Sequence, residues 1–216
     1  PEGIHHHYAR LAIVTATTIE DCRIHWPLEL KDQTCCTVTV GDEVHSHGDY
    51  QTIQAAVDSL PIKGGKVCVL PGEYNEDNIV IHNLHNIIIE GCATRSKVIS
   101  PVPTGGEAGT APVFHVTDST SIHIASLEIE ASDIANGVLL EEITTGAMQD
   151  IELHNLHVTA ATRSAIEVHL GSDIVIQNCH IDMLDQASDW PGIFVAADRA
   201  LIKENSITVT PGQGTT

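Results

Sequence analysis

Mostly apolar residues recur in a fixed pattern through the second half of the chain. They occupy the first, third, sixth and eighth positions of four segments, which begin at Ile122, Ile151, Ile174 and Ala200. Alternation with a period of two is typical of a strand buried on one face. The segments start 29, 23 and 26 residues apart. These intervals indicate a solenoid, in which each repeat buries its apolar face by stacking on its neighbours.

A third short strand is expected before each of these segments. The four candidates are Phe114–Val116, Val138–Leu140, Ile166–Val168 and Ile193–Val195. Similar patterns begin at Val67 and Ile79, which indicates earlier turns. Three strands a turn, stacked in register, predict an all-β parallel β-helix with apolar residues inside. In that register one buried column should contain Ile124, Leu153, Ile176 and Ile202.

A tight corner is predicted after the second strand of each turn. Small or polar residues occupy this place, namely Gly91, Ser126, Asn155 and Asn178. Gly and Asn tolerate the left-handed backbone conformation that a sharp bend needs. Stacked Asn side chains would also hydrogen-bond along the solenoid. We prefer this ladder to the alternative that Asn is simply common in turns.

Residues 1–46 are expected to form an N-terminal segment of strands and loops, and residues 47–216 the β-helix. Strands are predicted at residues 8–15 and 34–40. A short helix is predicted at about residues 50–60, with Asp49 as N-cap and Pro61 at its end. Its apolar face would contain Ile53, Ala56, Val57 and Leu60. We expect this helix to cap the N-terminal end of the solenoid.

The stretch GDYQTIQAAVDSLP at residues 48–61, followed by GGKVCVLPGEY at residues 64–74, resembles the opening segment of a known superfamily. This is the right-handed parallel β-helix superfamily that includes the pectin and pectate lyases. Residues 8–41 further resemble bacterial right-handed β-helix repeat proteins of unknown function. Enzymes of the superfamily carry Asn-Thr-Asp, Asp-Asp, Gly-His-Gly and Arg-Ile-Lys segments or a Ca²⁺-binding carboxylate cluster beside an Arg. None of these stands in this sequence, so the resemblance implies a fold and no activity.

The chain is acidic, with 29 Asp and Glu against 10 Lys and Arg in 216 residues and a formal net charge of −19. This charge disfavours nucleic acid and anionic membranes as partners, and no apolar stretch is long enough for membrane insertion. The chain starts without Met and ends without a polar cap. We therefore interpret it as part of a larger bacterial protein. We expect that protein to be extracellular, cell-surface or particle-associated, and to form a homo-oligomer such as a trimer or to join a larger assembly.

The six cysteines leave the redox compartment open, since their spacing fits no zinc pattern. Cys92 and Cys179 occupy equivalent inward positions three turns apart. That separation of about 14 Å is too long for a disulfide between them, so both are expected to be small core residues. The sequence does not decide which pairs form among Cys22, Cys35, Cys36 and Cys68.

Three outward residues are the catalytic candidates. Glu141 in one turn is expected beside His169 in the next, with Glu167 two residues away. A carboxylate beside an imidazole is the usual element of general acid–base chemistry. We favour the alternative of a surface ion pair, because no third group is apparent in the sequence.

A column of Glu128, His157 and His180 is the metal candidate, because Glu and His stacked at strand spacing are suitable ligands. We favour a solvated polar face here, since the chain has 14 His. No cofactor is otherwise indicated.

The best ligand candidate is the loop at residues 182–190. Trp190 would stack on a sugar ring, and Asp185 and Asp189 would bind hydroxyls or Ca²⁺. The alternative is that the indole ring folds onto the solenoid. We therefore expect a structural or binding module that presents loops to a glycan or a protein surface. The rival hypothesis is a polysaccharide lyase or glycoside hydrolase.

Overall fold

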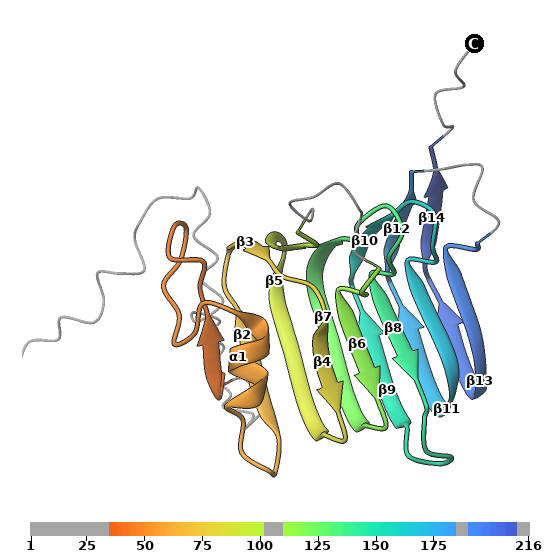
Figure 1. Ribbon diagram of the computed structural model, residues 1–216, viewed down its shortest axis with the longest axis horizontal. Helices are drawn as coiled ribbons and strands as arrows, with labels where there is room; N and C mark the ends of the chain where they lie inside the picture. The colour runs from red at the N-terminus through yellow and green to blue at the C-terminus, as the bar shows by residue number, and fades with distance from the viewer. Residues whose placement is uncertain (1–34, 102–109, 185–189, 211–216) are drawn as a thin grey trace, which may run out of the picture.

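The computed structural model describes residues 35–101, 110–184 and 190–210. Its strands stack in parallel to form a β-solenoid of about six turns, with the chain advancing along the long axis (Figure 1). Parallel pairing throughout and three faces for each turn confirm the architecture that the periodicity predicts. The long strands bend at a corner and belong to two faces each.

The three faces differ in the strands that they contain. The first face contains β1 (Val38–Val40), β2 (Gly65–Val69), β5 (His85–Ile99), β7 (Thr120–Glu130), β9 (Gln149–His154), and the later parts of β11 (Ile166–Gln177) and β13 (Ile193–Lys203). The second face contains β3 (Gly72–Asn75), the ends of β5 and β7, β10 (His157–Ala160), β12 (His180–Met183) and β14 (Ser206–Val209). The third face contains β4 (Ile79–His82), β6 (Phe114–Thr117), β8 (Val138–Glu141) and the first parts of β11 and β13.

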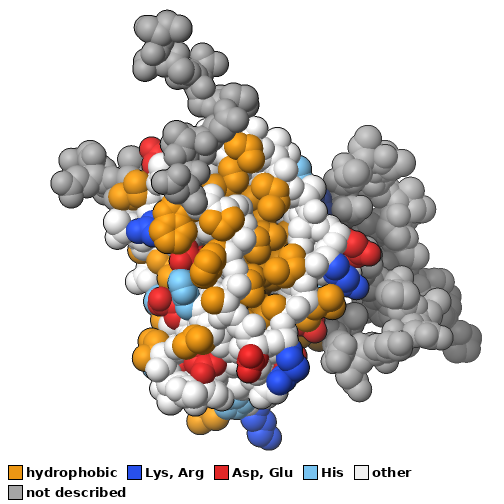
Figure 2. Space-filling view, turned by 90° about the vertical axis from the view of Figure 1, so that its right-hand side faces the viewer, with side chains coloured by type: hydrophobic (Ala, Val, Ile, Leu, Met, Phe, Trp, Pro, Cys, Tyr) orange, Lys and Arg blue, Asp and Glu red, His pale blue; other side chains and the backbone are white. Residues whose placement is uncertain are grey.

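The predicted core column is confirmed in register. Ile124 pairs with Leu153, Leu153 with Ile176, and Ile176 with Ile202. The first three side chains are buried, but Ile202 is 49% exposed. The expected burial of Ile202 is therefore wrong, because no described strand stacks on the far side of β13. Figure 2 looks onto this end of the solenoid and shows hydrophobic side chains gathered across it.

The predicted corners adopt the left-handed conformation at Ser126, Asn155 and Asn178, where φ is 57°, 51° and 54°. In the turn that precedes Ser126, the prediction of a left-handed corner at Gly91 is wrong. The positive φ lies at Ala93 instead, because this corner is wider and shifts the register of β5 against β7. The Asn155 and Asn178 side chains are exposed.

Hydrogen bonds along the solenoid axis come from an Asn that lies inside the last described corner. The Asn205 side chain accepts from the Cys179 backbone N–H at 2.8 Å and donates to the Ile176 carbonyl at 2.9 Å. The neighbouring Glu204 takes the left-handed conformation. A single Asn that satisfies backbone groups thus performs here the role that we had expected of a stack.

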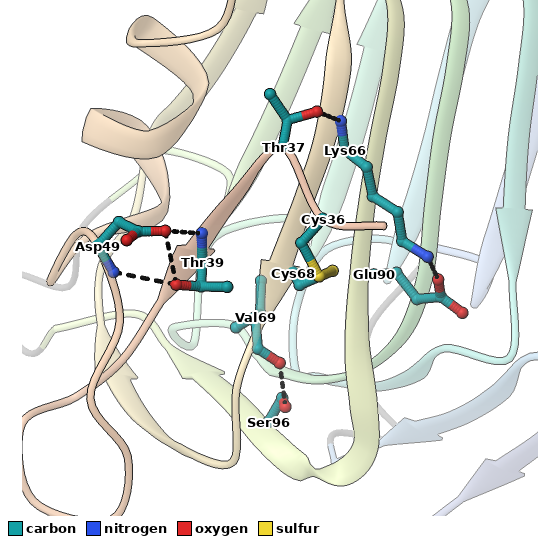
Figure 3. The surroundings of a disulfide bond; sticks show 9 residues. All are labelled: Cys36, Thr37, Thr39, Asp49, Lys66, Cys68, Val69, Glu90 and Ser96. Atoms are coloured by element: carbon teal, nitrogen blue, oxygen red, sulfur yellow. Dashed lines mark hydrogen bonds and ion pairs between the residues drawn. A yellow bond between two sulfur atoms is a disulfide. The ribbon is translucent and has the colours of Figure 1, made fainter. Parts of the chain in front are cut away.

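A disulfide joins the segment just before β1 to β2 at the N-terminal end of the described chain (Figure 3). It links Cys36 and Cys68, and so decides one of the pairings that the sequence left open. Next to it, the Thr37 hydroxyl accepts from the Lys66 backbone N–H at 2.9 Å. The disulfide and this hydrogen bond fasten the first strand to the solenoid.

The remaining cysteines differ from one another. Cys179 is a buried free thiol, as expected for a core residue, and Cys35 is exposed and free. Cys92 is buried, as expected for a core residue, but it is disulfide-bonded. The distance along the solenoid excludes only Cys179 as its partner.

The one helix among the described residues is α1 (Ile53–Asp58), which lies beside β2 and β4 in Figure 1. Its N-cap is Thr52, whose hydroxyl accepts from the Ala55 N–H. Asp49 instead accepts from the backbone N–H and hydroxyl of Thr39, both at 2.8 Å, so its predicted capping role is wrong. Three apolar side chains of α1 join the core, namely Ile53, Ala56 and Val57.

Several predictions fall outside the described residues. They concern the strand at residues 8–15, the pairing of Cys22, and Asp185 and Asp189 in the loop before Trp190. The boundary between residues 46 and 47 stays a prediction. Across residues 35–101, 110–184 and 190–210, no helix has the length and apolar character needed to cross a membrane.

Candidate functional site

The outward side chains of the third face form two parallel columns, because strand alternation turns every second residue away from the core. The first column contains His115, Leu139, Glu167 and Phe194. The second column contains Thr117, Glu141, His169 and Ala196. All three catalytic candidates therefore lie on one face, as the register predicted.

The carboxylate of Glu167 lies at the centre of this face. It is 6% exposed and lies 2.6 Å from the Nε2 atom of His169. Its second oxygen accepts from the side-chain amide of Asn136 at 2.7 Å. Asn136 is itself fixed, since it also donates to the Ser164 carbonyl at 2.8 Å. The structure thus supplies the third group that the sequence did not reveal.

Glu141 and His169 are paired in register, but their nearest ionic partners differ. Glu141 lies 2.7 Å from the Nε2 atom of His115, one turn earlier, whereas His169 binds Glu167 on its own strand. The face therefore carries two acid–imidazole pairs. We refer to His115, Asn136, Glu141, Glu167 and His169 as the acid–imidazole cluster.

This arrangement can position an imidazole for proton transfer. A buried carboxylate that holds one ring nitrogen fixes both the orientation and the tautomer of a histidine. The His169 side chain remains 44% exposed and its ring lies against Phe194 with 5.4 Å between centroids. A ligand on this face would therefore meet an oriented imidazole beside an aromatic ring.

Trp190 lies at the edge of the same face, three residues before β13 begins. It is 40% exposed, and the guanidinium carbon of Arg163 is 4.9 Å from its ring centroid. Arg163 stands three residues before β11, so the two side chains come from equivalent places in neighbouring turns. Arg163 covers part of the ring, and the choice between a sugar platform and a ring folded onto the solenoid stays a prediction.

A groove of about 650 Å³ runs along the corner between the third and first faces, one residue beyond His169. Its lining residues include Glu142, Leu170, Ala196 and Arg199. The Arg199 guanidinium binds the Asp173 carboxylate through two hydrogen bonds of 2.7 Å. Together with a hydrogen bond from Gln149, this pairing lowers the pKa of Asp173 to about 2.

The predicted metal column is in register, with Glu128 beside His157 and His157 beside His180. Glu128 lies 3.4 Å from the Lys97 ammonium group, which also contacts Glu130 at 2.6 Å. The hydrogen bond that Lys97 donates to Glu130 raises the pKa of Lys97, and burial partly opposes this shift. Glu128 thus already lies beside a cation, which it shares with Glu130.

The carboxylate that accompanies the two imidazoles is Asp182. Its oxygens lie 2.8 Å from His157 Nε2 and 3.2 Å from His180 Nε2. The sequence signal for this group was the alternation of His180 and Asp182, which places both on the outward side of one strand. The three residues are close enough to hold an ion, yet both imidazoles already have hydrogen-bond or ionic partners.

Comparison with known proteins identifies a fold. No protein-family model and no curated protein matches the sequence. Among solved structures, pectin methylesterase from carrot is 14% identical and has a TM-score of 0.50, covering 82% of this chain and 64% of that one. A pectin methylesterase in complex with a hexasaccharide is 13% identical with a TM-score of 0.48, covering 71% of this chain and 57% of that one. Escherichia coli YbhC is 13% identical with a TM-score of 0.48, covering 84% and 74%.

The likeness to the carrot protein shows a right-handed parallel β-helix fold, which is the fold that the resemblance implied. The chain spans less than two thirds of the length of the carrot protein and of the hexasaccharide-bound methylesterase. At this identity the likeness concerns the fold alone.

Proposed function

We propose that the chain is a glycan-binding β-helix module of a larger protein, and that the glycan lies on the third face. The observation that carries the proposal is the pair of Trp190 and Arg163 at the edge of this face. An exposed indole ring offers an apolar platform for a sugar ring. The guanidinium that lies over part of this ring offers hydrogen-bond donors to hydroxyl or carboxylate groups.

The remainder of the face supports an extended ligand. From Trp190 the ligand would pass over Phe194 and His169, and would reach the groove at the corner. Apolar rings interspersed with fixed polar groups are the usual composition of a small-molecule site.

A glycan array with the 216-residue chain, followed by calorimetry on the glycans that bind, tests this proposal. Replacing the indole by Trp190→Ala should weaken binding by about 1–3 kcal/mol, the range for loss of a stacking platform. Trp190→Phe is the matched control, since it keeps an aromatic face and should retain most of the affinity. If no glycan binds, or if Trp190→Ala binds like the parent, the proposal is wrong.

A polysaccharide-cleaving or ester-cleaving enzyme is the second candidate, and the Asn136–Glu167–His169 arrangement favours it. An oriented imidazole supplies one part of an acid–base mechanism. We expect no turnover of pectate or alginate, with or without Ca²⁺, because the catalytic segments of the superfamily are missing from the sequence. Turnover that is lost on Glu167→Gln would make the enzyme the leading hypothesis.

Two further assignments belong to this proposal. The helix α1 would cap the solenoid, because it packs against β1, β2 and β4 at the N-terminal end.

The Cys36–Cys68 disulfide supports an extracellular or cell-surface location, since disulfides persist in oxidising compartments. Ca²⁺ bridging would be one way for so acidic a chain to hold an acidic glycan.

A further inference from the structure

Two imidazole nitrogens are buried on the outer side of the first face, away from the acid–imidazole cluster. They are the Nε2 atoms of His123 on β7 and His154 on β9, and neither has a hydrogen-bond partner among the described residues. Most buried polar side-chain atoms are hydrogen-bonded, so an exception of this kind requires an explanation. Two such exceptions side by side point to a missing ligand.

A carboxylate completes the group. Glu152 pairs in register with His123 across the two strands, and its Oε2 atom lies 3.3 Å from His154 Nε2. One donor atom from each of the three residues lies within 4.8 Å of the other two. Ligands at about 2.1 Å from a tetrahedral zinc ion are separated by about 3.4 Å. Small side-chain rotations would therefore bring these three atoms to ligand distances.

We propose that His123, Glu152 and His154 bind a divalent transition-metal ion of the zinc type. Two imidazoles and one carboxylate form a ligand set that suits such an ion. The site would join two consecutive turns of the solenoid, because His123 and the other two ligands come from neighbouring strands.

The surroundings of the three residues suit a bound cation. The strands on either side place apolar residues next to the group, with Ile88 beside His123 and Val175 beside Glu152. Glu90 is the nearest further carboxylate on β5, and it is already paired with the Lys66 ammonium group at 2.5 Å. Gln177 on β11 is the neighbour of His154 in register and carries no charge.

A surface depression lined by Ser121, His123, Asp150 and Glu152 adjoins the group. It offers an entry path and room for a water molecule at the fourth coordination position.

The second His-and-Asp group on the second face provides the contrast. His157 and His180 already contact Asp182, and the Nδ1 atom of His180 lies 2.6 Å from the Ser206 hydroxyl. Those imidazoles have partners without a metal ion. Each of those imidazoles also has a hydrogen-bond partner, whereas among the described residues the Nε2 atoms of His123 and His154 have none and His154 has only its ionic contact with Glu152.

Calorimetric titration of the 216-residue chain with Zn²⁺ at neutral pH tests the proposal. We expect a saturable site that is lost on His154→Ala, with affinity falling by more than about 100-fold, since changes outside the ligand shell alone cost 10- to 100-fold. The control His180→Ala should bind like the parent. His5, His6 and His7 are common to all three proteins and do not affect the comparison.

A second readout keeps the test decisive if His154→Ala does not fold. Glu152→Gln replaces the carboxylate by an amide of the same shape, and should also weaken Zn²⁺ binding and abolish the visible absorption of four-coordinate Co²⁺. Parent protein without saturable Zn²⁺ binding would overturn the proposal. So would retention of binding by Glu152→Gln, or its loss in His180→Ala instead.

Discussion

Leu153→Ala is expected to destabilise the solenoid far more than Ile202→Ala, although both residues lie in the same core column. Leu153 is fully buried between Ile124 and Ile176, so its truncation leaves a cavity that two neighbouring turns enclose. Leu→Ala changes at such positions cost about 3–5 kcal/mol, from lost burial and from the cavity together. For a domain of this size, that corresponds to a melting temperature lower by about 6–20 °C.

Ile202 is the matched control, because its truncation to Ala removes the same number of carbon atoms. About half of its surface remains in water, and no described strand closes the space beyond it. The cost should therefore be about 1 kcal/mol or less. Thermal melts followed by circular dichroism, with urea melts for the free energy, measure both variants. Shifts of equal size, or a smaller shift for Leu153→Ala, would refute this account of the core.

Two further predictions concern the stability of variants at the N-terminal end of the described chain. The Asp42 side chain is 6% exposed. Burial acts to raise the pKa of its carboxyl group, but hydrogen bonds from His45 and from backbone N–H groups outweigh burial and hold this pKa well below the usual 3.8. The ionised carboxylate therefore stabilises the fold above pH 3.8, and this stabilisation is lost as the pH falls through the lower pKa of the folded state. Urea melts should show that Asp42→Asn is less stable than the parent at pH 7. The stability of the variant should also depend less on acid pH. Cys36→Ser removes a cross-link over 32 residues and should lower the unfolding free energy by about 3–4 kcal/mol; a melting temperature unchanged from the parent would contradict this.

The register of the solenoid follows from the sequence. A period of two fixes which side chains face inward, and the repeat spacing fixes which of them stack, so the contact of Ile124 with Leu153 and of His157 with His180 was predictable. The same logic placed Glu141 and His169 side by side. These are backbone properties, which strand alternation determines without knowledge of the side-chain rotamers.

Side-chain partners depend on the tertiary structure. A residue on an outward column has neighbours along its own strand, across the pair and diagonally, and the sequence does not rank them. Glu141 therefore binds His115, and His169 binds Glu167. Asn136 lies in a loop before β8, so no period relates it to the carboxylate that it orients.

The tertiary structure likewise decided which residues are buried at the end of the solenoid and which cysteines pair. Ile202 has the inward position that alternation predicts, yet it is half exposed because burial needs a strand on both sides. Cys36 and Cys68 pair because β1 adds to the sheet beside β2, a contact between segments that no repeat relates. The sequence by itself determined the coil and its inward face. The tertiary structure alone decided which polar groups meet, since that depends on how separate turns and loops approach in space.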